Sequence, residues 1–378
     1  MSDLTMNPEV TEMILEAGGE DLRICYQCGT CTGSCPWNDL SGLGVRDMIR
    51  KAQFGLEGFE GEDLWKCVTC NMCVSRCPRG VEIIDVIRSM RSILVEMDQL
   101  PRPLRTVLNS LDQEGNPWTE SRQERTKWIK GVDVKKVTPE TEYLLFTCCT
   151  PAYDSRSQKV ARSLVKILQA AGVDFGIIGE EASCCGDAAH KIGNPELFDE
   201  LKDSNLETFK KYGVNKIICI SPHCYKAFRD LYAMSDVEVY HYTEVIEKLM
   251  NEGKLKFKDQ KGKVITYHDP CYLGRHAGVY ETPRNVIRGI DGVEFKEMRR
   301  IRERSLCCGG GGGGAWMETA AGDRFAETRI EEALETGAGV IATGCPFCIL
   351  MLEDGAKSLN KDEEIEIKDL AEIVESAL

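Results

Sequence analysis

The sequence predicts a chain of mixed α and α/β class, with a helical N-terminal domain followed by two pseudo-symmetric, parallel α/β lobes. Three observations support this prediction: two cysteine runs are joined by segments of helical periodicity, the later part of the chain alternates short apolar runs with helical patterns, and that later part repeats itself. Alternation of strand and helix patterns is typical of parallel sheets, and an even repeat predicts related units.

Composition narrows the class further. At 378 residues and 42% apolar content, the chain is long enough for two or three domains. Its net charge is -14, and the absence of a basic cluster with interleaved aromatics disfavours nucleic-acid binding. No apolar run reaches the length of a membrane span, so we expect any membrane contact to go through a partner. The N-terminus lacks the features of a signal peptide, so we expect a cytoplasmic chain whose nineteen cysteines serve metal rather than disulfides.

Two cysteine runs, CYQCGTCTGSCP and CVTCNMCVSRCP, lie in the first hundred residues. Both follow the pattern of two-cluster ferredoxins, in which the last cysteine of each run binds the cluster held by the other run. By that rule we expect one cubane [4Fe-4S] cluster on Cys25, Cys28, Cys31 and Cys77, and a second on Cys67, Cys70, Cys73 and Cys35. Zinc is the weaker alternative, because structural zinc sites use pairs of cysteines.

Helical periodicity surrounds both runs. A short amphipathic helix and a turn are expected over residues 3–21, and two further apolar stripes consist of Val45, Met48, Ile49 and Ala52, and of Val86, Met90, Ile93 and Met97. Residues 1–100 are therefore predicted to form a helical ferredoxin-like domain. Residues 101–141 are predicted to be an ordered linker, because Trp118 and Trp128 need packing partners.

The remaining chain is a duplication, with one lobe at 142–255 and the other at 256–378. The offset from Cys149 to Cys271 is 122 residues, and the offset from Cys224 to Cys348 is 124. Predicted strands are Tyr143–Phe146, Phe175–Ile178, Lys216–Ile220, Val264–Tyr267, Val293–Phe295 and Val340–Ala342. With right-handed crossovers these strands give Rossmann-like lobes, and the cysteine motifs fall just after them, where open α/β sheets bind ligands.

The second lobe carries five cysteines in a C…CC…CxxC frame, namely Cys271, Cys307, Cys308, Cys345 and Cys348. An adjacent pair can hardly close a disulfide with itself, and five is an odd number, so the frame favours thiolates that converge on a metal. The alternative is a set of buried, inert cysteines. That alternative suits a single cysteine better than five at this spacing.

The frame resembles the CCG domain of the catalytic subunit of heterodisulfide reductase and its relatives, which include iron–sulfur subunits of glycolate and lactate oxidases. The stretch from CYQCGTC to RCPRGVEIIDV resembles the small iron–sulfur subunit of heterodisulfide reductase. The resemblance implies a non-cubane [4Fe-4S] cluster on the five cysteines of the second lobe, which would also be the candidate catalytic residues.

The first lobe has a degenerate copy of the frame, with Cys149, Cys184, Cys185 and Cys224 but Ser221 at the position of Cys345. A cubane on four cysteines, a distorted cluster with an alkoxide ligand and an empty site are the alternatives, and we favour a further [4Fe-4S] cluster. Cys148 and Cys219 fall outside the frame. Cys219 points to the same side of its strand as Ser221 and could replace it, but a buried structural thiol is the simpler interpretation of both.

Other residues flank the cysteines. The run Gly309 to Gly314 matches GxGxxG formally but lacks the context of a dinucleotide site, so Gly309, Gly310 and Gly311 are predicted to bring backbone N–H groups close to the cluster. His268, His276 and His223 are candidate proton donors, against the simpler role of holding a loop by hydrogen bonds. The same alternatives apply to Asp269 and Arg275.

Two functions fit these patterns. The first is an electron-transfer subunit of a heterodisulfide-reductase-like complex, which takes single electrons from a flavoprotein or ferredoxin partner; a membrane cytochrome or a reductase is a further candidate partner. The second is a disulfide reductase that cleaves its substrate between two clusters. Because Ser221 leaves only one frame complete, we favour the first.

Overall fold

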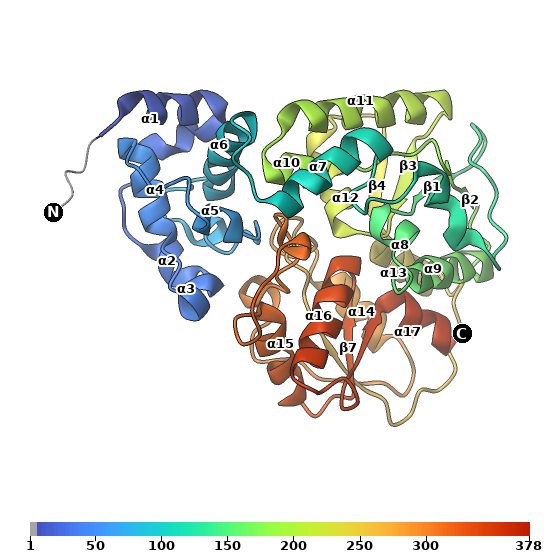
Figure 1. Cartoon of the computed structure of the whole chain (residues 1–378). Coiled ribbons are helices and arrows are strands. Elements are labelled where there is room, and N and C mark those ends of the chain that lie inside the picture. The colour runs from blue at the N-terminus through green and yellow to red at the C-terminus, as the bar shows by residue number, and fades with distance from the viewer. Residues whose placement is uncertain (1–5) are drawn as a thin grey trace.

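The computed structural model describes residues 6–378 and shows a helical N-terminal domain beside two α/β lobes (Figure 1). The helices of the N-terminal domain are α1 (Pro8–Ile14), α2 (Thr30–Ser34), α3 (Pro36–Ser41), α4 (Val45–Phe54), α5 (Asp63–Lys66) and α6 (Ile83–Glu96), with single turns at Leu15–Gly19, Glu20–Ile24 and Val74–Arg76. Of the helix expected from residue 3, residues 3–5 lie outside the described part of the chain, and within that part the helix begins at Pro8, after the N-cap Asn7. The combination of a helical domain and parallel sheets confirms the predicted fold class.

The apolar stripes form the core of the N-terminal domain. Val45, Met48, Ile49 and Ala52 are all buried on α4, as their spacing predicted. Gly55 ends this helix at a φ of 57°, and a Cβ there would lie 1.7 Å from the carbonyl oxygen of Asn7, so only glycine fits. Met97 was wrongly included in the second stripe: α6 ends at Glu96, and Met97 is 56% exposed because the chain leaves the helix there.

Each lobe contains a four-stranded parallel sheet, in the orders β2-β1-β3-β4 and β6-β5-β7-β8. The strands are β1 (Tyr143–Phe146), β2 (Phe175–Gly176), β3 (Lys216–Cys219), β4 (Glu238–His241), β5 (Val264–Tyr267), β6 (Glu294–Phe295), β7 (Val340–Thr343) and β8 (Glu366–Asp369). All six predicted strands are present, although β2, β3 and β6 are shorter than expected and β7 is one residue longer. The edge strands β4 and β8 were missed, because their sequences EVYH and EIKD mix polar and apolar residues and contain no apolar run.

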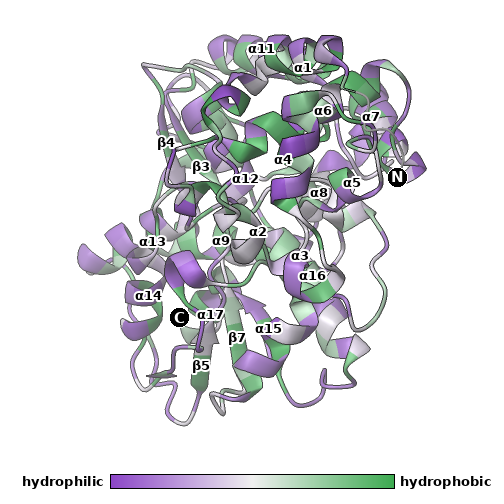
Figure 2. Ribbon diagram, turned by 90° about the vertical axis from the view of Figure 1, so that its left-hand side faces the viewer, coloured by the Kyte–Doolittle hydropathy of each residue, from purple (hydrophilic) through white to green (hydrophobic). Residues whose placement is uncertain are grey.

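Helices pack against the sheets, and Figure 2 shows β5 and β7 mainly in the hydrophobic colour. In the first lobe they are α8 (Cys149–Tyr153), α9 (Gln158–Ala170), α10 (Asp187–Ile192), α11 (Pro195–Lys211), α12 (Pro222–Lys226) and α13 (Tyr242–Asn251). In the second they are α14 (Glu281–Arg288), α15 (Phe325–Leu334), α16 (Pro346–Ser358) and α17 (Leu370–Ala377). Cys149 and Cys224 follow β1 and β3, and Cys271 and Cys348 follow β5 and β7, at the strand ends where such sheets bind ligands.

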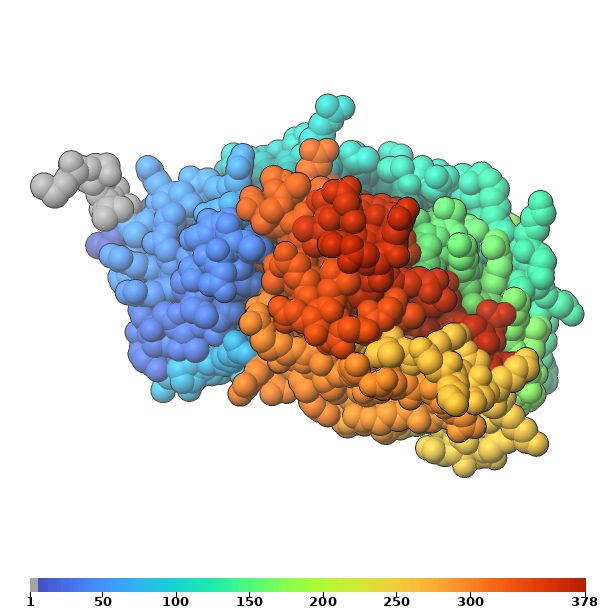
Figure 3. Space-filling model, turned by 90° about the horizontal axis from the view of Figure 1, so that it is seen from below, coloured from blue at the N-terminus to red at the C-terminus, as the bar shows by residue number. Residues whose placement is uncertain are grey.

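Residues 101–141 pack closely on the lobes. They form α7 (Arg102–Glu114) and a 3-10 segment, Arg122–Ile129. Trp128 is buried, and the ring of Trp118 stacks on that of Phe347 with centroids 6.3 Å apart. Seen from below, the N-terminal domain lies directly against the second lobe (Figure 3). Across residues 6–378, no helix combines the length and the apolar character that membrane crossing requires.

Candidate metal centres

All nineteen cysteines lie within the described residues, and none forms a disulfide. They gather instead in groups of thiols drawn from distant parts of the chain, several of them deeply buried. A set of soft, unpaired sulfur donors of this kind fits iron–sulfur clusters in its chemistry.

In the N-terminal domain, Cys35 of the first run shares a small cavity of about 20 Å³ with Cys67, Cys70 and Cys73 of the second. Burial raises the pKa of Cys35 to about 12, and its neighbours Cys67 and Cys70 add to the shift because the charges of adjacent thiolates repel. The structure thus brings together the four residues that the exchange rule assigned to one cluster.

The other cysteine set of the N-terminal domain, expected on Cys25, Cys28, Cys31 and Cys77, lies nearer the surface. Cys31 is close enough to Cys25 and Cys28 for their charges to raise its pKa, after burial as the main cause. Tyr26 is close to both Cys28 and Cys77, which brings Cys77 of the second run to the first. Cys28 is the one exposed cysteine among the nineteen, so this set has an edge open to solvent.

The five cysteines of the second lobe are all buried and converge. The sulfurs of Cys271 and Cys307 are 3.7 Å apart, and those of Cys348 and Cys308 are 3.3 Å apart. Cys345 lies within hydrogen-bond reach of Cys348. Burial opposes ionisation of Cys345, but hydrogen bonds from Cys348 and His223 outweigh it and lower its pKa to about 6. The site therefore favours thiolate, the form that binds metal.

His268 faces this group. In one buried cluster, a ring nitrogen of His268 and the sulfurs of Cys308 and Cys348 lie within 4.8 Å of one another. Its Nδ1 accepts a hydrogen bond from Nε of Arg329 at 3.1 Å. A guanidinium can only donate, so the proton of the neutral ring belongs on Nε2, toward the sulfur. Burial lowers the pKa of His268, which keeps the ring neutral.

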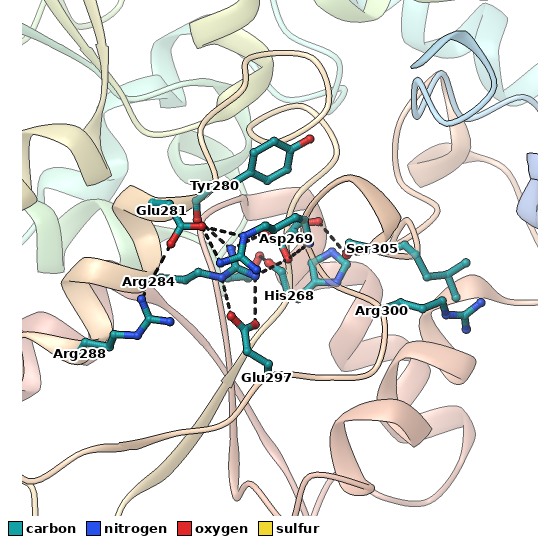
Figure 4. A network of polar contacts seen from close by, with 12 residues as sticks. His268, Asp269, Tyr280, Glu281, Arg284, Arg288, Glu297, Arg300 and Ser305 are labelled. Atoms are coloured by element: carbon teal, nitrogen blue, oxygen red, sulfur yellow. Dashed lines mark hydrogen bonds and ion pairs between the residues drawn. The ribbon is translucent and has the colours of Figure 1, made fainter. Parts of the chain in front are cut away.

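Asp269 holds the adjoining loops through a network of polar contacts (Figure 4). Its carboxylate accepts two hydrogen bonds from the buried guanidinium of Arg284, at 2.6 and 2.9 Å, and one from the backbone N–H of Arg302 at 2.8 Å. Its carbonyl oxygen accepts a hydrogen bond from Ser305. This network fixes the loop before Cys271 to the loop before Cys307, which positions both cysteines.

The first lobe also gathers its cysteines. Cys184 lies within hydrogen-bond reach of Cys149 and Cys185, and Cys185 also reaches Cys224. These four thiols line a cavity of about 40 Å³ that is also lined by Gly310 to Gly313 of the second lobe. The hydroxyl of Ser221 accepts a hydrogen bond from the N–H of His223 at 3.3 Å, so it caps α12.

Three aromatic rings connect the two lobes. His223 stacks on Tyr272 with centroids 3.7 Å apart, and Tyr272 stacks on His276 at 4.3 Å. His223 also binds Asp187 at 2.8 Å and reaches Cys345. Burial disfavours its imidazolium form, but these two partners outweigh burial and raise the pKa of His223 well above its ordinary value. His276 contacts the carbonyl of Thr69 at 2.8 Å, a bond that holds a loop.

The N-terminal domain and the second lobe meet at their cysteines. Cys70 lies within hydrogen-bond reach of Cys307, the largest cause that lowers the pKa of Cys70 to about 6. Nε of Arg275 donates to the carbonyl of Cys70 at 2.6 Å. Arg91, which is fully buried, donates to the carbonyls of Cys67 and Gly312 at 2.7 and 2.9 Å.

The glycine run follows this junction. Gly309 N–H points to the sulfur of Cys307 at 3.4 Å, as expected of a backbone donor beside the cysteines. A Cβ on Gly311 would lie 2.5 Å from the carbonyl oxygen of Val68, and one on Gly312 would lie 2.4 Å from that of Cys67. Gly311 and Gly312 therefore also allow the backbone of the second lobe to approach the N-terminal domain closely. The sequence alone did not reveal this need for glycine.

Several residues of these sites carried no sequence signal, namely Arg91, Arg125, Tyr272 and Arg329. Arg125, for example, comes from the linker and points its guanidinium at the sulfur of Cys149, 3.6 Å away. Beside the second-lobe cysteines, a cavity of about 700 Å³ reaches Cys308 and Gly309 and is lined by Trp37, Trp118 and Arg324 among others. Of the five cysteines of this lobe, Cys308 is thus the one that lines this cavity.

Two families of known proteins match the chain. The cysteine-rich CCG domain matches twice, at residues 143–229 and 265–353, and a 4Fe-4S dicluster domain matches residues 21–81. These matches identify an iron–sulfur protein and confirm the resemblance inferred from the cysteine spacing.

Three curated relatives extend the comparison. The probable iron-sulfur-binding oxidoreductase FadF of Bacillus subtilis is 39% identical and the EtfAB:quinone oxidoreductase of Syntrophomonas wolfei is 38% identical, each over 78% of this chain but only 43% of the relative. The chain thus spans less than half the length of these two proteins. One subunit of the dihydromethanophenazine:CoB--CoM heterodisulfide reductase of Methanosarcina acetivorans is 33% identical over 95% of this chain and 94% of the relative. The chain therefore belongs to the family of iron–sulfur oxidoreductases that includes this heterodisulfide reductase subunit.

Proposed function

We propose that this protein is the iron–sulfur electron-transfer subunit of a heterodisulfide-reductase-like complex. Bound clusters would supply one-electron redox chemistry at each cysteine group. Cys25, Cys28, Cys31 and Cys77 would hold one cubane, and Cys35, Cys67, Cys70 and Cys73 the other. Cys271, Cys307, Cys308, Cys345 and Cys348 would hold a non-cubane cluster, and the first lobe a further one.

The observation that carries this proposal is the proximity of Cys70 to Cys307, at a junction where Nε of Arg275 donates to the carbonyl of Cys70 at 2.6 Å and a Cβ on Gly312 would lie 2.4 Å from the carbonyl oxygen of Cys67. It joins the ligand set of the N-terminal domain to that of the second lobe with no intervening residue. The exposed Cys28 marks the opposite end, where a partner protein can approach. The order of the ligand sets thus runs from a solvent-open edge to a buried group beside a large cavity.

Rapid-freeze EPR tests this order. A reduced flavodoxin-type protein, too large to enter the cavity at Cys308, serves as donor to the anaerobic full chain. Cys70→Ser should slow reduction of the second-lobe site at least ten-fold, whereas Cys149→Ser in the first lobe should leave its rate unchanged. Equal rates in wild type and Cys70→Ser would rule out the proposed order.

A second function, cleavage of a disulfide, is favoured by the cavity that touches both lobes. Cysteines of the first lobe line it together with Gly310 to Gly313 of the second, so a ligand at the first-lobe cysteines would also touch the glycine run of the second lobe. Cleavage takes two electrons and two protons and gives two thiols. Release of both thiols from a mixed disulfide by the prereduced protein would establish this activity, and its absence would leave electron transfer alone.

The partners follow from the relatives by analogy. One relative is named an EtfAB:quinone oxidoreductase and another is a heterodisulfide reductase subunit. We propose a flavoprotein or ferredoxin as the electron donor or acceptor, with a membrane cytochrome or a reductase as the further partner. The nineteen unpaired thiols support a reducing compartment, and we propose the cytoplasm.

A further inference from the structure

The first lobe contains a fifth thiol at its cysteine group. Cys148 lines the same cavity as Cys149, Cys184, Cys185 and Cys224, and its residue is only 2% exposed. Its sulfur lies within hydrogen-bond reach of Cys224. The corresponding residue of the second lobe, one position before Cys271, is Pro270, so this thiol has no counterpart there.

The sulfur of Cys148 lies close to the position at which the first lobe lacks a frame cysteine. The backbone N–H of Ser221, the residue that replaces a cysteine, points to the sulfur of Cys148 at 3.3 Å. Ser221 itself is engaged elsewhere, because its hydroxyl caps α12 through the N–H of His223. The sulfur of Cys148 thus lies beside the one frame position whose own side chain offers no thiolate.

The backbone of Cys148 adds an independent observation. Its φ of 63° and ψ of 167° lie in a region that is essentially restricted to glycine. A residue with a side chain stays in such a conformation only when its surroundings enforce it, and residues of this kind concentrate at functional sites. Here the conformation accompanies a side chain that lines the cavity.

We propose that Cys148 takes the place of the missing frame cysteine, so that the first lobe is a five-thiolate cluster site built from Cys148, Cys149, Cys184, Cys185 and Cys224. The inference rests on the proposed role of these cysteine groups as cluster ligands. It makes both lobes complete in thiolates, and Ser221 then no longer argues against a reaction that needs both sites. Cys219, which is also buried but does not line the cavity, is a structural thiol.

Iron and sulfide analysis with Mössbauer spectroscopy on the anaerobically prepared full chain tests this assignment. Cys148→Gly removes the thiol and relieves the backbone strain, so a loss of iron cannot be attributed to misfolding. We expect Cys148→Gly to lose the Mössbauer component of the first-lobe site, with up to about four iron atoms per chain. The matched control Cys219→Ala, a second buried cysteine of the same lobe, should retain wild-type iron.

A rescue variant makes the test sharper. The double variant Cys148→Gly with Ser221→Cys again has five thiols, now at the five frame positions that are cysteines in the second lobe. It should regain the Mössbauer component of the first-lobe site. An unchanged spectrum and iron content in Cys148→Gly would overturn the proposal, as would an iron-free first lobe in the wild type. Neither of these results bears on the contact between Cys70 and Cys307, so failure here is distinguishable from failure of the proposed electron route.

Discussion

Cys70 of the N-terminal domain and Cys307 of the second lobe lie within hydrogen-bond reach of each other, although they belong to different domains and different sequence motifs. Three neighbouring contacts hold this junction: Arg275 to the carbonyl of Cys70, Thr69 to the hydroxyl of Tyr272 at 2.8 Å, and Arg91 to the carbonyl of Gly312. The junction therefore depends on packed backbone as well as on the cysteines, and each contact can be changed separately.

Arg91 is predicted to be the main polar anchor of the junction. Its buried guanidinium donates to carbonyls of Leu64, Cys67, Lys191 and Gly312, which come from all three parts of the chain. Arg91→Met leaves these acceptors without their charged donor and should lower the free energy of unfolding by on the order of 3 kcal/mol. Urea unfolding under anaerobic conditions measures this change. Arg50→Met, on the exposed face of α4, should change it by less than about 0.5 kcal/mol, and equal effects would contradict the anchor role.

Gly312 tests the close approach of the two domains. Its φ is 59°, and an added Cβ would lie 2.4 Å from the carbonyl oxygen of Cys67. Gly337 has a similar φ of 70° with nothing within 4 Å of the added atom, so Gly337→Ala carries only the conformational cost. Gly312→Ala should destabilise the protein by at least about 1 kcal/mol more than Gly337→Ala and should slow reduction of the second-lobe site. If the two variants were equally stable, the glycine run would not be needed for domain contact.

His268 is predicted to tune the second-lobe site through a hydrogen bond. Arg329 fixes the ring so that Nε2–H faces the sulfur of Cys308, and hydrogen bonds to cluster sulfurs influence reduction potential. Replacing the ring by an apolar one, His268→Phe, removes the donor that offsets negative charge. The midpoint potential of this site should become more negative in an EPR-monitored redox titration. His190→Gln, at a half-buried histidine of the first lobe, should not shift it, and an unshifted potential in His268→Phe would show that the bond has no such role.

His241 is predicted to make the stability of the folded protein depend on pH. Burial lowers its pKa to about 3, so the folded protein keeps this ring neutral while the unfolded chain binds a proton below about 6.5. Because the unfolded state then binds more protons, stability is fully present above about pH 6.5 and falls as the pH decreases, by up to about 1.4 kcal/mol per pH unit. Unfolding measured from pH 7 to 5 should show a smaller slope for His241→Asn than for wild type.

A matched control separates titration from packing at this histidine. Thr243→Val removes the hydroxyl that contacts Nδ1 of His241 at 2.8 Å but leaves the titrating ring in place. It should lower stability at every pH and keep the wild-type slope. A wild-type slope in His241→Asn would mean that this ring does not stay neutral in the folded protein.

Fixed local spacings made much of the architecture predictable. The two cysteine runs, the CCG frame and the apolar strands β1, β3, β5 and β7 are all written in short, regular patterns, and the fold class follows from them. Strands β4 and β8 were missed because edge strands need no apolar run. Arg91, Arg125 and Arg329 were missed for another reason: their partners are backbone carbonyls or side chains from distant segments, which leave no spacing in the sequence.

Cys148 illustrates the same limit within the site itself. The duplication aligned it with Pro270, outside the frame, so its sequence position gave no reason to count it with the ligands. Only the fold places its sulfur beside Ser221 and Cys224. His276 shows the reverse case: its position near the cysteines suggested a proton donor, whereas its contact with Thr69 is that of a loop-holding residue.

An iron-edge anomalous difference map from crystals of the anaerobically prepared full chain tests the central claim most directly. We predict a peak within each cysteine group, including one enclosed by Cys35, Cys67, Cys70 and Cys73 and a neighbouring one at Cys271, Cys307, Cys308, Cys345 and Cys348, on either side of the contact between Cys70 and Cys307. A map without iron on one side of that contact, in protein that retains its full iron content in solution, would contradict the account.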